Sequence, residues 1–347
     1  MAVDFNYSNR KENIVTNLNV VITDYIEPDL LWEEEQCKKM GVELRHYQLK
    51  TAGAEELIKV TRNADVVVVN MARIDAQVIG SLQNCKLIIR HGIGYDNVDV
   101  EAATRKGIKV ANIPDYCVEE VAEQAVTLIM ASQRKILHQS QILKGSVEAG
   151  AWKFDSIYPV YRIAGKTVGI VGFGRIGSKV FRMLQGFGVR FIIVDPYISE
   201  ERKKEFGIQT SSFETLLREA DIITAHVPLI WEETYHMFDA PQFNLMKPSA
   251  ILVNTSRGGI VNLEALDAAL RQGKLAMAGI DVYEQEPPAH DLGLLSNPNA
   301  ICTPHLSWLS EEAGISIRHK IIDYISRLKN NEPLINIVNS ANLLAVK

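Results

Sequence analysis

Short apolar runs alternate with helix-like stretches along most of this chain, and the alternation occurs in two series. The first series contains VVIT at 20–23, VELRHY at 42–47, VVVV at 66–69, LIIR at 87–90 and IKVAN at 108–112. The second series begins at Lys166 and contains KTVGIV, FIIVD, DIITAHV, AILVNTS, MAGIDV and AICTP. Such alternation indicates parallel βα units, and nearly continuous apolar runs are typical of strands covered on both faces. We therefore predict an α/β protein with two parallel-sheet domains, Rossmann-like or flavodoxin-like.

The length of 347 residues is sufficient for two domains of ordinary size. A helical pattern without Gly or Pro at 118–139 follows Pro114, and we expect it to connect the domains. A last amphipathic pattern, at 308–329, lies beyond the second series and is expected to return to the first domain. The predicted domains are therefore residues 1–112 with 317–347, and residues 113–316.

Composition and charge exclude several functional classes. The 42 acidic residues outnumber the 37 basic ones, giving a net charge of −5, so we expect no nucleic-acid partner. The chain has no apolar run of membrane-spanning length and no leader at its start, so we expect no membrane partner and a cytoplasmic location. Its four cysteines are widely separated and fit no metal-ligand spacing, which predicts reduced thiols and no metal site.

A glycine motif at the start of the second series predicts a dinucleotide site. Gly172, Gly174 and Gly177 have G-x-G-x-x-G spacing between an apolar strand and a helix that also includes Arg175 and Ile176. The first glycine permits a tight turn, the second lets a pyrophosphate approach the backbone, and the third allows close packing of helix on strand. The next strand ends in Asp195, whose carboxylate can bind both ribose hydroxyls and would repel the extra phosphate of NADP. We therefore expect NAD as the cofactor.

Polar side chains gather after three later strands of the second series. Arg257 follows AILVN, Asp281 and Glu286 follow MAGI, and His305 follows AICTP. Ligands of open α/β sheets bind beyond the carboxyl ends of the strands, so these groups are expected to lie together. A guanidinium can hold a carboxylate through two hydrogen bonds, and a histidine beside a carboxylate can exchange a proton with a developing alkoxide. A lone histidine after a strand is more often structural, and the neighbouring groups favour catalysis here.

The chain resembles the D-isomer-specific 2-hydroxyacid dehydrogenase family over nearly its whole length. The matching stretches are VGIVGFGRIG, VPLIWEET, LVNTSRGGIVN, AGIDVYEQEP and TPHLSW, in that order. The resemblance implies that Arg257 binds the substrate, that Glu286 pairs with His305, and that His305 is the acid/base. It also implies that residues 113–316 bind NAD and that the discontinuous domain binds the substrate, with the active site in the cleft between them.

The same resemblance implies further site residues. Asp281 would contact the nicotinamide carboxamide, and Val121 the nicotinamide ring, although plain helix packing also explains Val121. RHGIGYDNVD at 90–99 is similar to the loop whose N–H groups grip the substrate carboxylate. The loop assigns Ile93 and Gly94 to the substrate site with Arg90 nearby, which could instead be a solvated charge. The remaining residues expected to line the cofactor are Val227, Pro228, Thr234, Thr255 and Ser256.

Within the family, ICTPHLSWLSEEA and RHGIGYDNVD look most like the branch of the C-terminal-binding protein corepressors and their bacterial relatives. In that branch Trp308 would face the substrate side chain, or it could simply anchor the last helix. The preferred interpretation is an NAD-dependent D-2-hydroxyacid dehydrogenase acting as a homodimer. The alternatives are an NAD(H)-sensing, peptide-binding scaffold and a D-3-phosphoglycerate dehydrogenase, although we expect no appended regulatory domain after the last helix. The sequence leaves open which 2-hydroxy acid is used.

Overall fold

The computed structural model describes residues 18–152 and 157–340, and the chain divides into two compact units. The first unit contains the chain up to Tyr116 and again from Glu311, and the second contains Cys117–Ser310. These divisions lie four residues after and six residues before the expected domain boundaries. The last helix begins at Glu311, and its residues Ile317, Ile321, Tyr324 and Ile325 belong to a core of the first unit.

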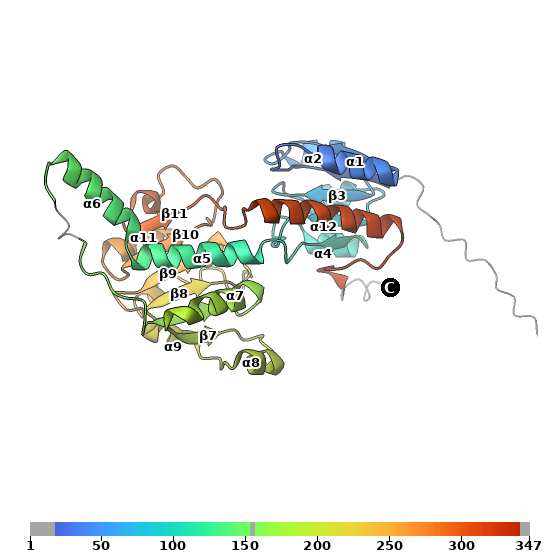
Figure 1. Ribbon diagram of the computed structural model, residues 1–347. Coiled ribbons are helices and arrows are strands. Elements are labelled where there is room, and N and C mark those ends of the chain that lie inside the picture. Colours follow the sequence, from blue (N-terminus) through green and yellow to red (C-terminus); the bar gives the residue numbers. More distant parts are fainter. Residues whose placement is uncertain (1–17, 153–156, 341–347) are drawn as a thin grey trace, which may run out of the picture. The chain divides into compact units, whose positions relative to one another are not determined.

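The first unit is built on a five-stranded parallel sheet with the order β2-β1-β3-β4-β5. Figure 1 labels the central strand, β3. Its strands are β1 (Leu18–Ile22), β2 (Val42–His46), β3 (Val66–Val69), β4 (Leu87–Arg90) and β5 (Lys109–Ala111). Each strand falls on one of the apolar runs of the first series, with ends that differ by two residues or fewer.

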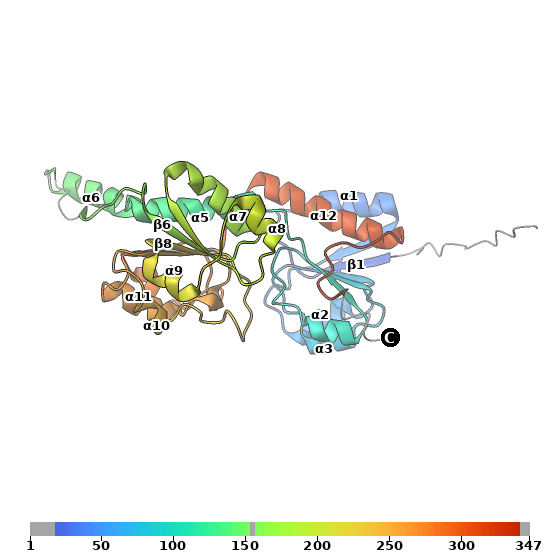
Figure 2. The ribbon, with the colours of Figure 1, turned by 90° about the horizontal axis from the view of Figure 1, so that it is seen from below.

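Both faces of this sheet are apolar because successive side chains of a strand point to opposite faces. Val66 and Val68 belong to one core, and Val67 and Val69 to the other. The helices of the unit are α1 (Leu31–Met40), α2 (Ala54–Thr61), α3 (Ala76–Ser81), α4 (Val100–Arg105) and α12 (Glu311–Lys329). Figure 2 shows α1 and α12 on one side of the sheet and α2 and α3 on the other. The continuous valine run is therefore a strand that is buried on both faces.

The second unit contains a six-stranded parallel sheet with the order β11-β10-β9-β8-β6-β7. Its strands are β6 (Thr167–Val171), β7 (Arg190–Val194), β8 (Ile222–Ala225), β9 (Ile251–Asn254), β10 (Met277–Ile280) and β11 (Ala300–Cys302). The strand order reverses at β6, which has β7 on one side and β8 on the other. Ligands of open α/β sheets bind at such a switch point. The expected parallel α/β fold is thus confirmed in both units.

Helices cover both faces of the second sheet, as Figure 2 shows for α5 and α7 on one side and α9 and α11 on the other. Its helices are α5 (Val118–Gln133), α6 (Ile136–Glu148), α7 (Arg175–Leu184), α8 (Glu200–Phe206), α9 (Phe213–Glu219), α10 (Ala240–Phe243) and α11 (Leu263–Arg271). Short 3₁₀ turns lie at Gln185–Phe187, Gly258–Ile260 and Gly293–Ser296. Polar side chains accept hydrogen bonds from the first-turn backbone at the starts of α8 to α11, which fixes where these helices begin.

The expectation of one helix over 118–139 is wrong, because the chain breaks it at Lys135. This residue has a left-handed backbone with φ of 51°, and a new helix, α6, then runs to Glu148. Neither Gly nor Pro marks the break, so the sequence pattern did not predict it. Among the described residues, no helix combines the length and the apolar character that crossing a membrane requires.

Candidate active site

Three neighbouring strand ends of the second unit carry the predicted catalytic side chains. Strands β9, β10 and β11 are adjacent and parallel, so their carboxyl ends meet at one edge of the sheet. Arg257 follows β9, Glu286 follows β10 and His305 follows β11. The sheet order thus brings together three residues that are far apart in the sequence.

His305 and Glu286 form a direct pair, with 2.7 Å between Nδ1 of the imidazole and Oε2 of the carboxylate. Burial by itself would raise the pKa of Glu286. The hydrogen bond and charge of His305, the N–H of Tyr283 and the charge of Arg257 outweigh burial and hold the pKa below its usual range. Arg257 is therefore close enough to act on this carboxylate, and Glu286 stays ionised at neutral pH.

The backbone of His305 is left-handed, with φ of 56°, a conformation that few residues other than glycine adopt. Two contacts hold the backbone in this state: the His305 N–H donates to the Asp281 carbonyl at 2.8 Å, and Trp308 Nε1 donates to the His305 carbonyl at 3.0 Å. Trp308 itself is half-buried. The indole N–H therefore fixes the loop that presents the imidazole, a role that the sequence did not reveal.

The Asp281 carboxylate holds the same loop through hydrogen bonds. It is completely buried and accepts hydrogen bonds from the hydroxyls of Thr303 and Ser307 and from the N–H groups of Leu306 and Ser307. Four donors from the His305 loop thus surround one carboxylate. The Asp281 side chain is 0% exposed, and its expected contact with the nicotinamide carboxamide stays a prediction.

The turn that carries Arg257 is shaped by Asn254 at the end of β9. Its side chain donates to the Arg257 carbonyl at 2.9 Å and accepts from the Ser256 N–H at 3.0 Å. Gly258 lets this turn lie against the backbone after β10, because an added Cβ atom would lie 1.9 Å from the Tyr283 carbonyl carbon. Within the described part of the chain, the buried Thr255 hydroxyl has no hydrogen-bond partner. A buried hydroxyl without a partner is unusual, so this one is available to a ligand.

The glycine turn after β6 has the geometry that each glycine predicts. Gly172 is left-handed with φ of 88°, and a Cβ atom at Gly177 would lie 2.0 Å from the Gly172 carbonyl oxygen. A Cβ atom at Gly174 would meet no protein atom within 4 Å. The first and third glycines are therefore required by the fold, whereas the second leaves an open space in front of the helix start. Arg175 is exposed and Ile176 is half-buried at that helix start.

Asp195 lies beside the glycine turn and is oriented by it. One carboxylate oxygen accepts from the Phe173 N–H at 2.7 Å and the other from the Tyr197 N–H at 2.9 Å. Each oxygen keeps further acceptor capacity, because a carboxylate can accept about four hydrogen bonds. The carboxylate is therefore fixed in place and still able to bind hydroxyl groups.

The loop after β8 completes the surroundings of the turn. Val227 is adjacent to Gly172, because a Cβ atom there would lie 2.8 Å from Val227 Cγ1. The Thr234 hydroxyl donates to the Pro228 carbonyl and accepts from the Ile230 N–H, both at 2.7 Å, so it fixes the shape of this loop. The residues expected from Val227 to Thr234 thus form one structured loop beside the glycine turn.

Two residues next to the turn were missed by sequence reasoning. Arg202, in α8, donates to the carbonyls of Phe173 and Gly174 at 3.2 Å and to the Ser178 hydroxyl at 2.7 Å. His226 follows β8, and burial lowers its pKa to about 3, which keeps the imidazole neutral. No spacing signal identifies Arg202, because it reaches the turn from a separate helix.

The remaining predicted site residues belong to the end of β4, to the loop after it and to α5. Arg90, Ile93 and Gly94 belong to the first unit, where the Arg90 guanidinium folds back over Gly92 and donates to the His91 carbonyl. Val121 lies in the first turn of α5 and is 6% exposed.

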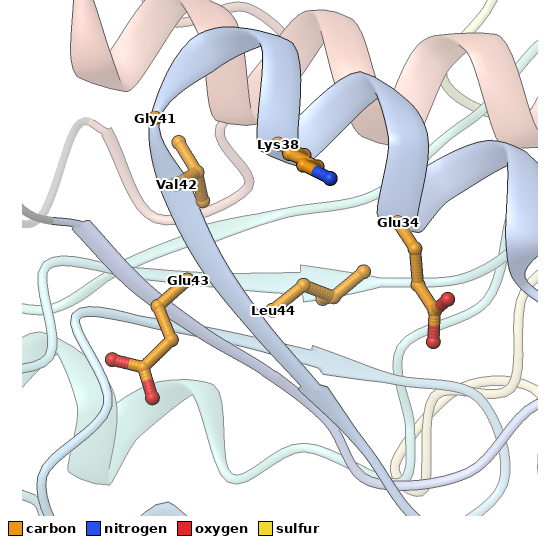
Figure 3. Close-up of a pocket in the computed structure, with 6 residues that line it drawn as sticks. All are labelled: Glu34, Lys38, Gly41, Val42, Glu43 and Leu44. Carbon is orange, nitrogen blue, oxygen red and sulfur yellow. The ribbon is translucent and has the colours of Figure 1, made fainter.

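The structure also has a surface hollow, and it has side chains of the types that bind metal ions. Figure 3 shows a hollow on the first unit between α1 and β2, lined by Glu34, Lys38, Gly41, Val42, Glu43 and Leu44, none of which is a predicted site residue. In the described ranges, no cluster of His, Cys, Asp and Glu could hold a metal ion.

The chain is similar to known proteins in sequence and in structure. Residues 126–307 match the model of the D-isomer specific 2-hydroxyacid dehydrogenase NAD binding domain. A glyoxylate reductase of Korarchaeum cryptofilum is 39% identical over 77% of this chain and 80% of its own length. A D-3-phosphoglycerate dehydrogenase of Archaeoglobus fulgidus is 36% identical over 93% of this chain, which spans only 59% of that relative. The solved D-lactate dehydrogenase of Aquifex aeolicus, complexed with NAD and lactic acid, superposes with a TM-score of 0.79. It is 27% identical, over 90% of this chain and 96% of that one.

Proposed function

The chain belongs to the D-isomer specific 2-hydroxyacid dehydrogenase family, and on this premise we propose that it interconverts a D-2-hydroxy acid and a 2-oxo acid with NAD. The observation that carries the proposal is the pair of His305 and Glu286 at the strand ends that also carry Arg257. A histidine with a fixed carboxylate partner, beside a cationic group, suits proton transfer to the oxygen of a bound oxo acid.

The residues of the second unit fit a bound dinucleotide. The open space in front of Gly174 would take the pyrophosphate, and the fixed Asp195 carboxylate would accept from the ribose hydroxyls. The buried Thr255 hydroxyl has no partner among the described residues and would gain one from the cofactor. A carboxylate at position 195 favours NAD over NADP, because the extra phosphate would be repelled.

The proposed chemistry divides into hydride and proton transfer. When bound, NADH would supply the hydride that reduces the oxo carbon. The Nδ1 atom of His305 faces Glu286, so Nε2 is the atom that gives a proton to the substrate oxygen during reduction and takes it back during oxidation. The ionised Glu286 stabilises the protonated imidazole and keeps its ring orientation.

Carboxylate recognition is the proposed role of Arg257 and of the loop after β4. The guanidinium can make two parallel hydrogen bonds to the substrate carboxylate. We assign the N–H groups of Ile93 and Gly94 to the same carboxylate, with Arg90 beside them. Trp308 is assigned to the substrate side chain, although its observed contact is with the His305 carbonyl.

A short 2-oxo acid such as glyoxylate is the substrate that we favour. The glyoxylate reductase of Korarchaeum cryptofilum is 39% identical to this chain, and the phosphoglycerate dehydrogenase of Archaeoglobus fulgidus is 36% identical. The phosphorylated 2-oxo acid remains the second candidate. The relatives reported above are named as enzymes, so they do not support the finer resemblance to the corepressor branch.

The test is NADH oxidation by the purified protein with glyoxylate, pyruvate, hydroxypyruvate and 3-phosphohydroxypyruvate. We expect turnover of at least one of these acids, a D-configured product wherever the product is chiral, and a strong preference for NADH over NADPH. Turnover of none of them would contradict the proposal. Binding of short apolar peptides by the inactive protein would then favour a scaffold.

A homodimer formed through the second unit is also part of the proposal. Helix α6 projects from this unit (Figure 1) and exposes four large apolar side chains between 49% and 71%: Ile136, Leu137, Leu143 and Val147. Trp152, just beyond the helix, is 79% exposed. A patch of this kind marks an interaction site, and a second copy buries it symmetrically.

We also propose a cytoplasmic location, because all four cysteines are free thiols.

A further inference from the structure

Two adjacent backbone N–H groups in the loop after β4 have no acceptor among the residues that the structure describes. They belong to Ile93 and Gly94, which are both half-buried. The carbonyl oxygens of the same two peptide units are occupied. Gly92 O accepts from the Ile113 N–H at 2.9 Å, and Ile93 O accepts from Asn112 Nδ2 at 2.6 Å. Among the described residues, the two carbonyl oxygens therefore accept hydrogen bonds, whereas the two N–H groups donate none.

This asymmetry determines where the two donors point. Both peptide bonds are trans, and in a planar trans peptide the C=O and N–H bonds point in opposite directions. Because both carbonyls face the segment that follows β5, both N–H groups face away from it. Two successive N–H groups that point the same way form a concave site for an anion such as a carboxylate. Loss of either carbonyl contact would let the peptide unit rotate.

Asn112 is itself held by a closed ring of hydrogen bonds. Its N–H donates to the Asn336 carbonyl at 3.3 Å, Asn336 Nδ2 donates to the Tyr324 hydroxyl at 2.6 Å, and that hydroxyl donates to the Asn112 carbonyl at 3.1 Å. Asn112 and Tyr324 are buried, at 8% and 2% exposure. Residues from α12 and from the segment after it therefore fix the backbone of Asn112, the residue whose side chain holds the loop.

We propose that Asn112 is a positioning residue for substrate recognition, which orients the N–H groups of Ile93 and Gly94 toward the 2-oxo acid carboxylate. Tyr324 and Asn336 keep Asn112 in place. This inference rests on the proposed function, since it requires the loop to bind the substrate carboxylate. It adds a residue that contacts neither substrate nor cofactor, and whose effect is specific to substrate affinity.

The test compares Asn112→Ala with Asn339→Ala. Asn339 is a control of the same residue type in the same unit, because its buried side chain makes three hydrogen bonds, to Val110, Thr104 and Ile108, without contacting the loop. Steady-state kinetics with glyoxylate and NADH, together with urea unfolding, would be measured for both variants. Asn112→Ala should raise KM for glyoxylate roughly tenfold, with kcat and the Kd for NADH little changed. Asn339→Ala should lower the unfolding midpoint and leave KM unchanged.

Tyr324→Phe gives a second variant that keeps the buried ring and removes the hydroxyl. It should raise KM in the same direction by a smaller factor, and it decides the question if Asn112→Ala does not fold. The inference would be overturned by an unchanged KM for glyoxylate in a folded Asn112→Ala protein. If only Tyr324→Phe folds, an unchanged KM in that variant would overturn it. A rise in KM in Asn339→Ala equal to that in Asn112→Ala would also overturn it. Failure of the wild-type protein to reduce any 2-oxo acid would instead contradict the proposed function.

Discussion

His305 Nδ1 lies 2.7 Å from Glu286 Oε2, although the two residues are 19 positions apart and follow different strands. In the proposed reaction, this contact leaves Nε2 as the nitrogen that would face the substrate, and it places a negative charge beside the imidazole. The buried Asp281 carboxylate and the Trp308 indole hold the loop that makes this contact possible.

Replacement of His305 by Ala should abolish proton transfer and leave the cofactor site intact. We expect kcat for 2-oxo acid reduction to fall by roughly two to four orders of magnitude, the usual contribution of a positioned acid/base. NADH binding, followed by fluorescence titration, should change little. Turnover equal to that of the wild-type protein would contradict the assignment.

Glu286→Gln should change the pH dependence of the same reaction. The Glu286 carboxylate loses its charge as the pH falls through its lowered pKa, and an amide has no charge to lose, so the decline of the rate at low pH should be absent from the variant. The pH–rate profile of kcat/KM measures this change. A variant profile that is lower at every pH but keeps the same decline at low pH would contradict a role for the carboxylate charge.

Substitution of Arg257 by Ala should chiefly weaken binding of the 2-oxo acid. Two charge-assisted hydrogen bonds would be lost, so we expect KM to rise by roughly two orders of magnitude. Arg271→Ala is the control, because Arg271 forms an exposed ion pair with Asp267 in the same unit. Preserved substrate affinity in Arg257→Ala would argue against the clamp role.

The glycine turn offers two variants with opposite expected effects on folding. Gly174→Ala has room for its methyl group, so the unfolding midpoint should stay near that of the wild-type protein while the Kd for NADH rises at least about tenfold. Gly177→Ala would place the methyl group against the Gly172 carbonyl, so it should destabilise the protein. Thermal unfolding and NADH titration distinguish the two. Unchanged NADH affinity in Gly174→Ala would show that the open space is not the phosphate site.

The buried pair of Glu27 and His91 predicts a pH-dependent stability. Burial would raise the pKa of Glu27, but the contact with His91, at 3.1 Å, and nearby N–H groups lower it from 4.5 to about 2. The ionised carboxylate therefore contributes stability above pH 4.5, and this contribution is lost as the pH falls toward 2. A lowering of the pKa by one unit corresponds to about 1.4 kcal/mol, so the lowered pKa of Glu27 corresponds to roughly 3 kcal/mol of stability.

Glu27→Gln should accordingly lower the free energy of unfolding at pH 6 and make a smaller difference at pH 3.5. Urea unfolding at the two pH values measures this change. Glu101→Gln is the control, because the Glu101 side chain is 85% exposed and should show little effect at either pH. An equal loss of stability at both pH values in Glu27→Gln would contradict the linkage.

Val147→Asp tests the proposed dimer contact of α6. The side chain is 71% exposed, so the substitution should leave the fold intact and disrupt burial of the helix against a second copy. Sedimentation velocity should show a shift from dimer to monomer. Leu31→Asp, at an apolar position 68% exposed in the first unit, should leave the dimer unchanged.

Local signals in the sequence were sufficient for the strands, the glycine turn and the three catalytic candidates. Buried strands and tight turns depend on residues close together in the chain, and parallel strand ends meet at a common edge, so Arg257, Glu286 and His305 could be grouped without coordinates. The break between α5 and α6 could not be predicted in this way, since neither Gly nor Pro marks Lys135.

Tertiary structure alone decided how the site residues are held. Asp281 is surrounded by four donors from a loop more than 20 residues away, and Asn112 is tied to Tyr324 across 212 positions. Such contacts form only when distant segments pack together, and they leave no periodicity or spacing in the sequence. For this reason the sequence by itself determined which chemical groups are present, and the packing determined which of them are oriented, buried or left open to a ligand.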